Sequence, residues 1–290
     1  MPNKPQIGYV VAKKDFDEGD EILIKLLSPK VDVVVVSLGS RVDIKDILDK
    51  TKKCKIIYNN ATCNDSTFEA LEVSKTLEEQ GKRVINSSHS YYYEEDKWMF
   101  YLKCLEHNLP TPETHLISKG AVYNEKRIKE LLKGGPVILK AIFSERGKCV
   151  FKADNYKEFG QHIKDIVSKN YLSPIIAQRY IPNSNRSYRV TLINNKVRQS
   201  VAKIGRSWKQ TGIRYDIIRL VKLPQEVKAI CEKTSKVLGM NVCGLDLVEN
   251  KGRWYLIEAN SCPGWDFIAR DEKKLLTHLA NYLISFVKKN

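Results

Sequence analysis

The sequence predicts an α/β protein, in which a small doubly wound unit precedes two units of mixed α+β structure. Three observations point to this class. Strand-like runs alternate with helical periodicity in the first ninety residues, later runs are typical of antiparallel hairpins, and a chain of 290 residues is long for a single core. No internal repeat or low-complexity linker interrupts the chain, so we expect closely packed units, of which the first covers 1–88.

The first unit is expected to contain four short strands rich in β-branched residues. They are the runs 7–11, 31–39, 53–60 and 82–86. Helical periodicity covers 65–81, with Asp65 or Ser66 as the N-cap and Gly81 as the stop. This alternation predicts a small doubly wound sheet, which by itself names no function.

The second unit is expected to open with an amphipathic helix, Glu94–His107, which Pro110 and Pro112 end. Two strands joined by a polar loop follow within 134–151, and 173–182 supplies another strand. In the third unit, 187–205 is typical of a hairpin that turns at Asn194-Asn195, and 224–239 of a helix that ends at a glycine.

Composition indicates an ordinary soluble, cytoplasmic protein. Hydrophobic residues make up 42% of the chain, no apolar run approaches the roughly 20 residues that span a bilayer, and 7–12 is too short for a signal-peptide core. Seven cysteines without a C-x-x-C pair argue against a disulfide framework or a zinc site. No local motif supports a Cys-His nucleophilic enzyme.

The formal charge of +15 is the strongest compositional feature. Nucleic acid is an obvious partner for such a charge, but the chain has no helix-turn-helix, RNP-like or zinc-finger motif. We therefore interpret the excess as serving smaller anions, such as nucleotides and multiply carboxylated substrates, with general solubility as the alternative.

A metal site is indicated near the end of the chain. In the strand within "RWYLIEANSCPGW", alternation places Trp254, Leu256, Glu258 and Asn260 on one face. A three-residue hairpin loop, 251–253, would pair Glu258 with Asp246. Opposed carboxylates destabilise a sheet unless a cation such as Mg²⁺ lies between them. The alternative is another loop length, with both acids solvated at a sheet edge.

A second candidate is Lys140, on the apolar strand "PVILKAI" before a loop that contains Gly147. Its ammonium group either snorkels out of the sheet or binds a nucleotide phosphate, with backbone N–H groups of the loop covering the phosphates.

Four motifs then follow in order between Ile85 and Phe267. They are "VINSSHSYYYEEDKWMFYLKCLEHNLPTPET", "VILKAIFSERGKCV", "IAQRYIPNSNRSYRV" and "GLDLVENKGRWYLIEANSCPGW". Together they resemble the ATP-grasp ligases, most closely the RimK-like amino-acid ligase branch that includes glutamate ligases. The resemblance implies an ATP-grasp fold, with a central subdomain at 89–181 and a C-terminal subdomain at 182–290 behind the N-terminal α/β domain.

Residue by residue, the resemblance implies a nucleotide and metal site. Lys97 and Lys140 would contact the ATP phosphates under the loop of Gly147, and Arg189 would act with Lys140 in catalysis, against the acyl phosphate. The adenine hinge and the other nucleotide contacts would be Gln178, Arg179, Tyr180, Ile181, Ser187 and Lys203. Two Mg²⁺ ions, or Mn²⁺ in their place, would be held by Asp246, Glu258 and Asn260. Arg179 and Ser187 stand where relatives have an acid.

The resemblance implies an ADP-forming ligase that joins glutamate or a similar amino acid to an acid, and the charge of the chain predicts that this acid is multiply anionic, such as a cofactor. The substrate-facing residues would be Arg206, Lys209, Arg214 and Ser261. Alternatives are a ligase that modifies an acidic carrier protein or a protein C-terminus, and a non-catalytic nucleotide- or nucleic-acid-binding protein. The sequence leaves open whether the chain forms a homo-oligomer, and it predicts no membrane partner.

Overall fold

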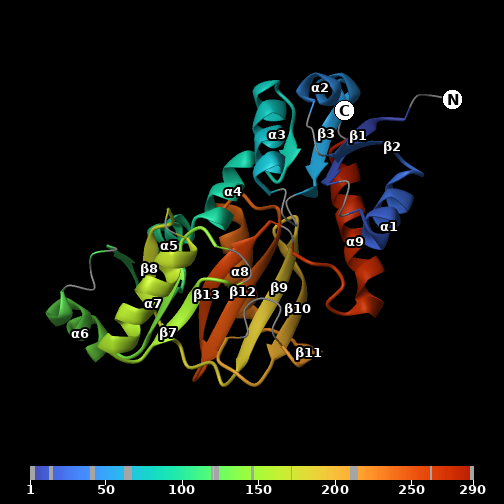
Figure 1. Cartoon of the computed structure of the whole chain (residues 1–290). Helices are drawn as coiled ribbons and strands as arrows, with labels where there is room; N and C mark the ends of the chain where they lie inside the picture. Colours follow the sequence, from blue (N-terminus) through green and yellow to red (C-terminus); the bar gives the residue numbers. More distant parts are fainter. Residues whose placement is uncertain are drawn as a thin grey trace.

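The computed structural model describes residues 4–12, 16–39, 43–61, 67–118, 120, 124–144, 147–170, 172–209, 215–261 and 263–287. Within these residues, three sheets of four, four and five strands follow one another along the chain (Figure 1). Among the described residues, no helix is both long enough and apolar enough to cross a membrane.

The first sheet is entirely parallel, in the order β2-β1-β3-β4. Its strands are β1 (Gln6–Ala12), β2 (Asp32–Leu38), β3 (Cys54–Asn59) and β4 (Val84–Ile85). Its helices are α1 (Glu18–Leu27), α2 (Ile44–Thr51) and α3 (Thr67–Glu79). One core cluster contains α1 and another contains α2 and α3, so both faces of the sheet are covered. The predicted doubly wound unit is confirmed; the predicted N-caps of α3, Asp65 and Ser66, lie outside the described residues.

The second sheet has the order β5-β8-β6-β7 and is antiparallel. Its strands are β5 (Thr114–Ile117), β6 (Val137–Ala141), β7 (Val150–Ala153) and β8 (Ile175–Arg179). The helices of this region are α4 (Ser88–Glu95), α5 (Lys97–Glu106), α6 (Glu125–Lys133) and α7 (Tyr156–Lys169). Helices α6 and α7 contribute to its core.

The single helix predicted over Glu94–His107 is wrong at its start. Asp96 has an extended backbone and separates α4 from α5. Its side chain accepts hydrogen bonds from the backbone N–H groups of Trp98 and Met99, which is the geometry of an N-cap. A new helix therefore begins at Lys97.

The third sheet is antiparallel, in the order β11-β10-β9-β12-β13. Its strands are β9 (Arg186–Ile193), β10 (Lys196–Ile204), β11 (Ile217–Leu220), β12 (Val242–Asn250) and β13 (Arg253–Asn260). Helix α8 (Gln225–Val237) packs on one face, where its buried residues share a core with α5. The predicted turn at Asn194-Asn195 is confirmed, since both residues have positive φ and Ile193 pairs with Lys196.

The turn between β12 and β13 is shorter than predicted. Asn250 pairs with Arg253, so the loop has only two residues, Lys251 and Gly252. Their φ angles are 51° and 81°, as a type I′ turn requires.

A β-bulge in β13 compensates for the shorter turn. Leu247 pairs with Leu256, whereas the next residue along β12 toward the N-terminus, Asp246, pairs with Glu258. Ile257 is therefore the extra residue of the bulge. The predicted pairing of the two acids is correct, although the loop length from which it was argued is wrong.

The bulge also reverses which side chains share a face. Leu256 and Ala259 both belong to the core under the third sheet, and Trp254 packs against that core. The prediction that Trp254, Leu256, Glu258 and Asn260 share a face is therefore wrong, because Glu258 and Asn260 lie on the opposite face from Leu256.

The last helix, α9 (Ala269–Ser285), returns to the first sheet. Figure 1 shows it beside α1 and β1, and its buried residues share one core cluster with both. The predicted third unit, 182–290, includes this segment, but no helix was predicted over the segment itself. The two ends of the described chain thus form one core.

Candidate active site

Charged side chains from adjacent strands meet at one level of the third sheet. Asp246 of β12 pairs with Arg189 of β9 on one side and with Glu258 of β13 on the other. Its Oδ1 atom lies 3.2 Å from Nε of Arg189 and 3.8 Å from Nζ of Lys203 on β10. Asp246 and Lys203 are both buried, so these charges face one another rather than bulk water.

The two acids differ in proton affinity. Although burial opposes ionisation of Asp246, Arg189 and Lys203 hold the pKa of its carboxyl below the ordinary value. Burial raises the pKa of Glu258, and the negative charge of Asp246 adds to the rise. Burial lowers the pKa of Lys203, against the pull of Asp246. When two carboxyl groups lie in contact, the pKa of one is expected to rise well above that of the other.

The donor atoms at this position suit a hard divalent ion. Both carboxylate oxygens of Asp246 are buried without a well-aligned hydrogen-bond donor among the described residues. Asn260 would contribute its amide oxygen, because an amide nitrogen does not bind a hard cation. Asn260 pairs with Gly244, two residues along β12 from Asp246. Among the described residues no group of three His, Cys, Asp or Glu forms a complete cage. A Mg²⁺ ion here would therefore need further oxygens, such as those of phosphate, which is its usual mode of binding.

Lys140 brings a cation from the second sheet. Its Nζ atom donates to Oε1 of Gln178 at 2.8 Å, and Nε2 of Gln178 donates to Oγ1 of Thr114 at 3.1 Å. Lys140 is only 6% exposed, so the alternative in which it snorkels to solvent is wrong. Burial lowers the pKa of Lys140 to about 8, and the charge of Glu258 opposes this shift. The site thus lies between the second and third sheets.

Lys97 contacts the loop between β6 and β7. It is the first residue of α5, and its Nζ atom donates to the carbonyl oxygens of Ile142 at 3.0 Å and Ser144 at 2.7 Å. Both carbonyls belong to the start of the loop that was predicted to cover phosphates. The structure therefore brings Lys97 to the predicted phosphate site.

Lys140 lines an open pocket, whose volume of about 420 Å³ includes space open to solvent. Its lining residues are Ile138, Lys140, Val150, Gln178, Arg179, Tyr180, Ile181, Asn183, Trp208, Val248 and Ile257. The predicted hinge, 178–181, forms one side, and aliphatic or aromatic side chains form most of the rest. Such a lining fits a flat heteroaromatic base.

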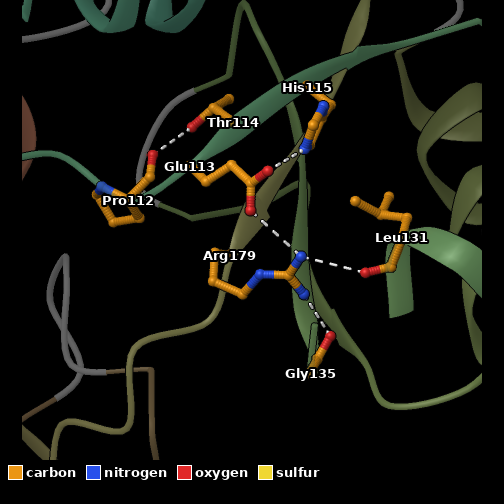
Figure 2. A network of polar contacts seen from close by, with 7 residues as sticks. All are labelled: Pro112, Glu113, Thr114, His115, Leu131, Gly135 and Arg179. Carbon is orange, nitrogen blue, oxygen red and sulfur yellow. Dashed lines mark hydrogen bonds and ion pairs between the residues drawn. The ribbon is translucent and has the colours of Figure 1, made fainter. Parts of the chain in front are cut away.

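The side chain of Arg179 serves the fold of the hinge. Figure 2 shows its guanidinium between two carbonyl groups, donating to Gly135 O at 2.6 Å and to Leu131 O at 3.1 Å. Glu113 lies 3.4 Å from the same group, and its other oxygen lies 3.0 Å from Nε2 of His115. Arg179 thereby ties β8 to the end of α6.

The remaining predicted nucleotide residues lie nearby. Ser187 is fully buried on β9 and pairs with Lys203 of β10. Gly147 lies in the β6–β7 loop and has a φ angle of 67°, which favours glycine.

The predicted substrate residues make separate contacts. Arg206 is exposed and lies 3.4 Å from Asp216, whereas Nζ of Lys209 donates to backbone carbonyls of the β6–β7 region. Ser261 is buried after β13 and hydrogen-bonds Glu94, whose pKa burial raises to about 7. Arg214 lies outside the described residues.

Several pocket residues were missed by sequence reasoning. Ile138 and Val248 were within reach, because each lies two residues from a recognised site residue on the same strand face. Asn183, Trp208 and Ile257 were not, because a loop conformation or the bulge brings them to the pocket.

Known proteins share the sequence features of this chain. A family model for the RimK-like ATP-grasp domain matches residues 94–287. The coenzyme γ-F420-2:α-L-glutamate ligase of Methanocaldococcus jannaschii is 24% identical over 269 residues, which cover 89% of this chain and 91% of that protein. The α-aminoadipate–LysW ligase LysX of Saccharolobus solfataricus is 25% identical, over 69% of this chain and 73% of its own.

Solved structures share the fold. The RimK domain ATP-grasp protein of Sphaerobacter thermophilus superimposes with a TM-score of 0.69 at 16% identity, covering 95% of this chain and 98% of its own. D-alanine–D-alanine ligase of Bacillus anthracis, solved with ATP, gives a TM-score of 0.69 at 18% identity, with 99% of both chains covered. The family match extends over the second and third sheets with the whole site between them, and so the chain belongs to the RimK-like ATP-grasp family and is an ATP-grasp ligase.

Proposed function

We propose that this protein is an ATP-dependent carboxylate–amine ligase that forms an amide through an acyl phosphate, joining glutamate or a similar amino acid to a multiply anionic acid. The observation that carries the proposal is the pair Asp246 and Glu258, opposed on one sheet and faced by Lys140 from another. Such an arrangement suits a metal-bound triphosphate, because the ion relieves the repulsion between the acids and the lysine neutralises phosphate charge.

The pocket and the lysines would bind ATP. The apolar lining and the backbone of 178–181 hold the adenine, while Lys140 and Lys97 neutralise the phosphates. The small loop of Gly147 covers them with its N–H groups. Ser187 and Lys203 pair across β9 and β10, and Nζ of Lys203 lies 3.8 Å from Oδ1 of Asp246, so we assign both residues to the nucleotide site.

Asp246, Glu258 and Asn260 would hold Mg²⁺, or Mn²⁺ in its place. The bound ions supply charge neutralisation and orientation of the triphosphate. Removal of divalent ions with EDTA is therefore expected to abolish ADP formation.

The proposed reaction has two steps, and the protein promotes them by positioning the reactants and neutralising their charge. A carboxylate oxygen of the acid attacks the γ-phosphorus of ATP and ADP departs, which leaves an acyl phosphate. The amine then attacks the acyl carbon, phosphate departs, and the amine gives up a proton. Arg189, held 3.2 Å from Asp246, neutralises the acyl phosphate and the tetrahedral species. No protein nucleophile is required.

The acid substrate is proposed to carry several negative charges. The formal charge of +15 and the exposed Arg206 support this, as do relatives named for glutamate ligation. Electrostatic attraction of a charged substrate to the protein weakens as salt screens it, with a Debye length of about 10 Å at 0.1 M salt. The KM for the acid should therefore rise with salt and in Arg206→Ala. A singly charged acid that reacts fastest, indifferent to salt, would contradict the proposal.

A specific observation favours one alternative, an acidic carrier protein or peptide as the acid substrate. LysX is named as an α-aminoadipate–LysW ligase, and PsnB, a structural neighbour with a TM-score of 0.69 at 15% identity, was solved with a precursor peptide. The deciding experiment is a mass-spectrometric screen of acids and peptides against amino acids with Mg·ATP. Ligation appears as ADP together with a product lighter by one water than the sum of the two reactants. ATP turnover that no acid and amine pair stimulates would count against the ligase itself.

A further inference from the structure

One cation of the predicted substrate set is bound internally. Lys209 lies in the connection between β10 and β11, and its Nζ atom donates to the carbonyl oxygens of Gly147 at 2.5 Å and Val150 at 3.0 Å. Bonds from an ammonium group to carbonyl oxygens are charge-assisted and stronger than neutral ones. The side chain is half-buried, whereas Arg206 and Ser207 of the same connection are exposed.

Gly147 is shaped to receive this lysine. A Cβ atom at Gly147 would lie 2.9 Å from Cε of Lys209, closer than side chains approach, and the φ angle of 67° disfavours any other residue. Absence of a side chain at this position therefore lets the lysine stem pass directly over the loop.

Trp208, the residue before Lys209, holds the β10–β11 connection against other residues of the pocket. Nδ2 of Asn183 donates to the carbonyl oxygen of Trp208 at 3.0 Å, and the Trp208 ring meets the ring of Tyr180 edge-on with centroids 6.0 Å apart. All three residues line the pocket. Trp208 and Lys209 thus extend from the hinge to the β6–β7 loop.

We propose that Lys209 is a positioning residue for the nucleotide: it straps the β10–β11 connection to the β6–β7 loop and so holds the phosphate-covering loop over the pocket. The proposal rests on the nucleotide site of the proposed function and reassigns Lys209 from the acid substrate to that site. Lys97, which donates to Ile142 O and Ser144 O, holds the start of the same loop. The loop is therefore held by ammonium groups near both of its ends.

The test is calorimetric titration of the full chain with Mg·ADP. Lys209→Met keeps the length of the side chain but loses its charge and donors, and is expected to raise the Kd for Mg·ADP about tenfold, given the strength of charge-assisted hydrogen bonds. The matched control is Lys196→Met at the other end of β10, which removes the same charge from an exposed ion pair with Glu232. Its Kd should stay within about twofold of wild type.

Two further readouts separate positioning from a purely structural role. The urea midpoint of Lys209→Met should stay near that of wild type, and Lys209→Arg, which keeps the charge and donors, should recover most of the affinity. Gly147→Ala, which acts on the same contact from the loop, should weaken Mg·ADP in the same direction. This second variant decides the question if Lys209→Met does not fold.

Unchanged Kd values in Lys209→Met and Gly147→Ala would overturn the strap. An equal loss of affinity in Arg206→Met would also overturn it, because local charge rather than the contact with the loop would then explain the effect. If wild type binds Mg·ADP and these outcomes occur, the proposed function stands without the strap. A wild-type protein that binds no adenine nucleotide would overturn both.

Discussion

At the scale of single residues, the chemistry depends on two carboxylates that a sheet would not normally place together. Glu258→Gln keeps the shape of the side chain but removes one charge. We expect it to abolish ADP formation, because the metal would lose an anionic ligand. Folding should persist, and the metal-free protein should be at least as stable as wild type, because repulsion from Asp246 is relieved.

Coupled assay of ADP release and urea unfolding of the EDTA-treated protein would measure the two effects of Glu258→Gln. Glu249→Gln is a suitable control, because Glu249 lies on the same hairpin near its turn. Wild-type turnover in Glu258→Gln would contradict the assigned role of this acid.

Because the pKa of Lys140 is lowered, we expect nucleotide binding to depend on pH. Burial lowers the pKa of its ammonium group from 10.5 to about 8 in the protein without nucleotide. The group is therefore cationic below pH 8 and loses its proton as the pH rises through 8, so affinity for Mg·ADP should fall over that range. Lys140→Met should bind more weakly and show a flatter profile. Wild-type affinity in the variant, or a wild-type profile that is flat between pH 7 and 9, would contradict a phosphate contact.

At the scale of elements, the β12–β13 turn offers a stability test. Lys251 has a φ angle of 51°, a left-handed conformation that Asn adopts more easily than Lys and that two-residue hairpins fill with Asn-Gly. Lys251→Asn should raise the free energy of unfolding by about 0.5–1 kcal/mol without changing activity. Urea denaturation measures the change.

The turn between β9 and β10 supplies the reverse experiment. Asn194 is exposed with a φ angle of 56°, so Asn194→Lys should lower the free energy of unfolding by a similar amount. If both substitutions moved stability in the same direction, turn conformation would not be the cause.

At the scale of the whole molecule, α9 joins the end of the chain to its beginning. Leu283 is fully buried in the core that β1, α1 and α9 share. Leu283→Ala should lower the free energy of unfolding by about 2–5 kcal/mol, because it leaves a cavity in the core between α9 and the first sheet. Lys274→Ala, on the exposed side of α9, should change it by less than about 0.5 kcal/mol. Loss of less than 1 kcal/mol in Leu283→Ala would contradict the packing role of α9.

The sequence by itself determined the fold class, the order of the motifs and the identity of the charged residues at the site. Local rules were sufficient for these: β-branched runs, glycine stops, the Asn-Asn turn and the residue spacing of four motifs all act within short segments. The opposition of Asp246 and Glu258 was also predicted, although a turn one residue shorter and the bulge at Ile257 together produce it.

Only the tertiary structure decided which of the remaining side chains reach the site. Whether Lys140 turns to solvent or to Gln178 depends on the sheet that lies over it, and whether Lys209 faces a substrate or Gly147 depends on a loop 62 residues away in sequence. The bulge had no signal in the sequence, because it follows from matching β13 to both the turn and the core beneath it. Contacts between distant segments are set by packing, and a single sequence does not display packing.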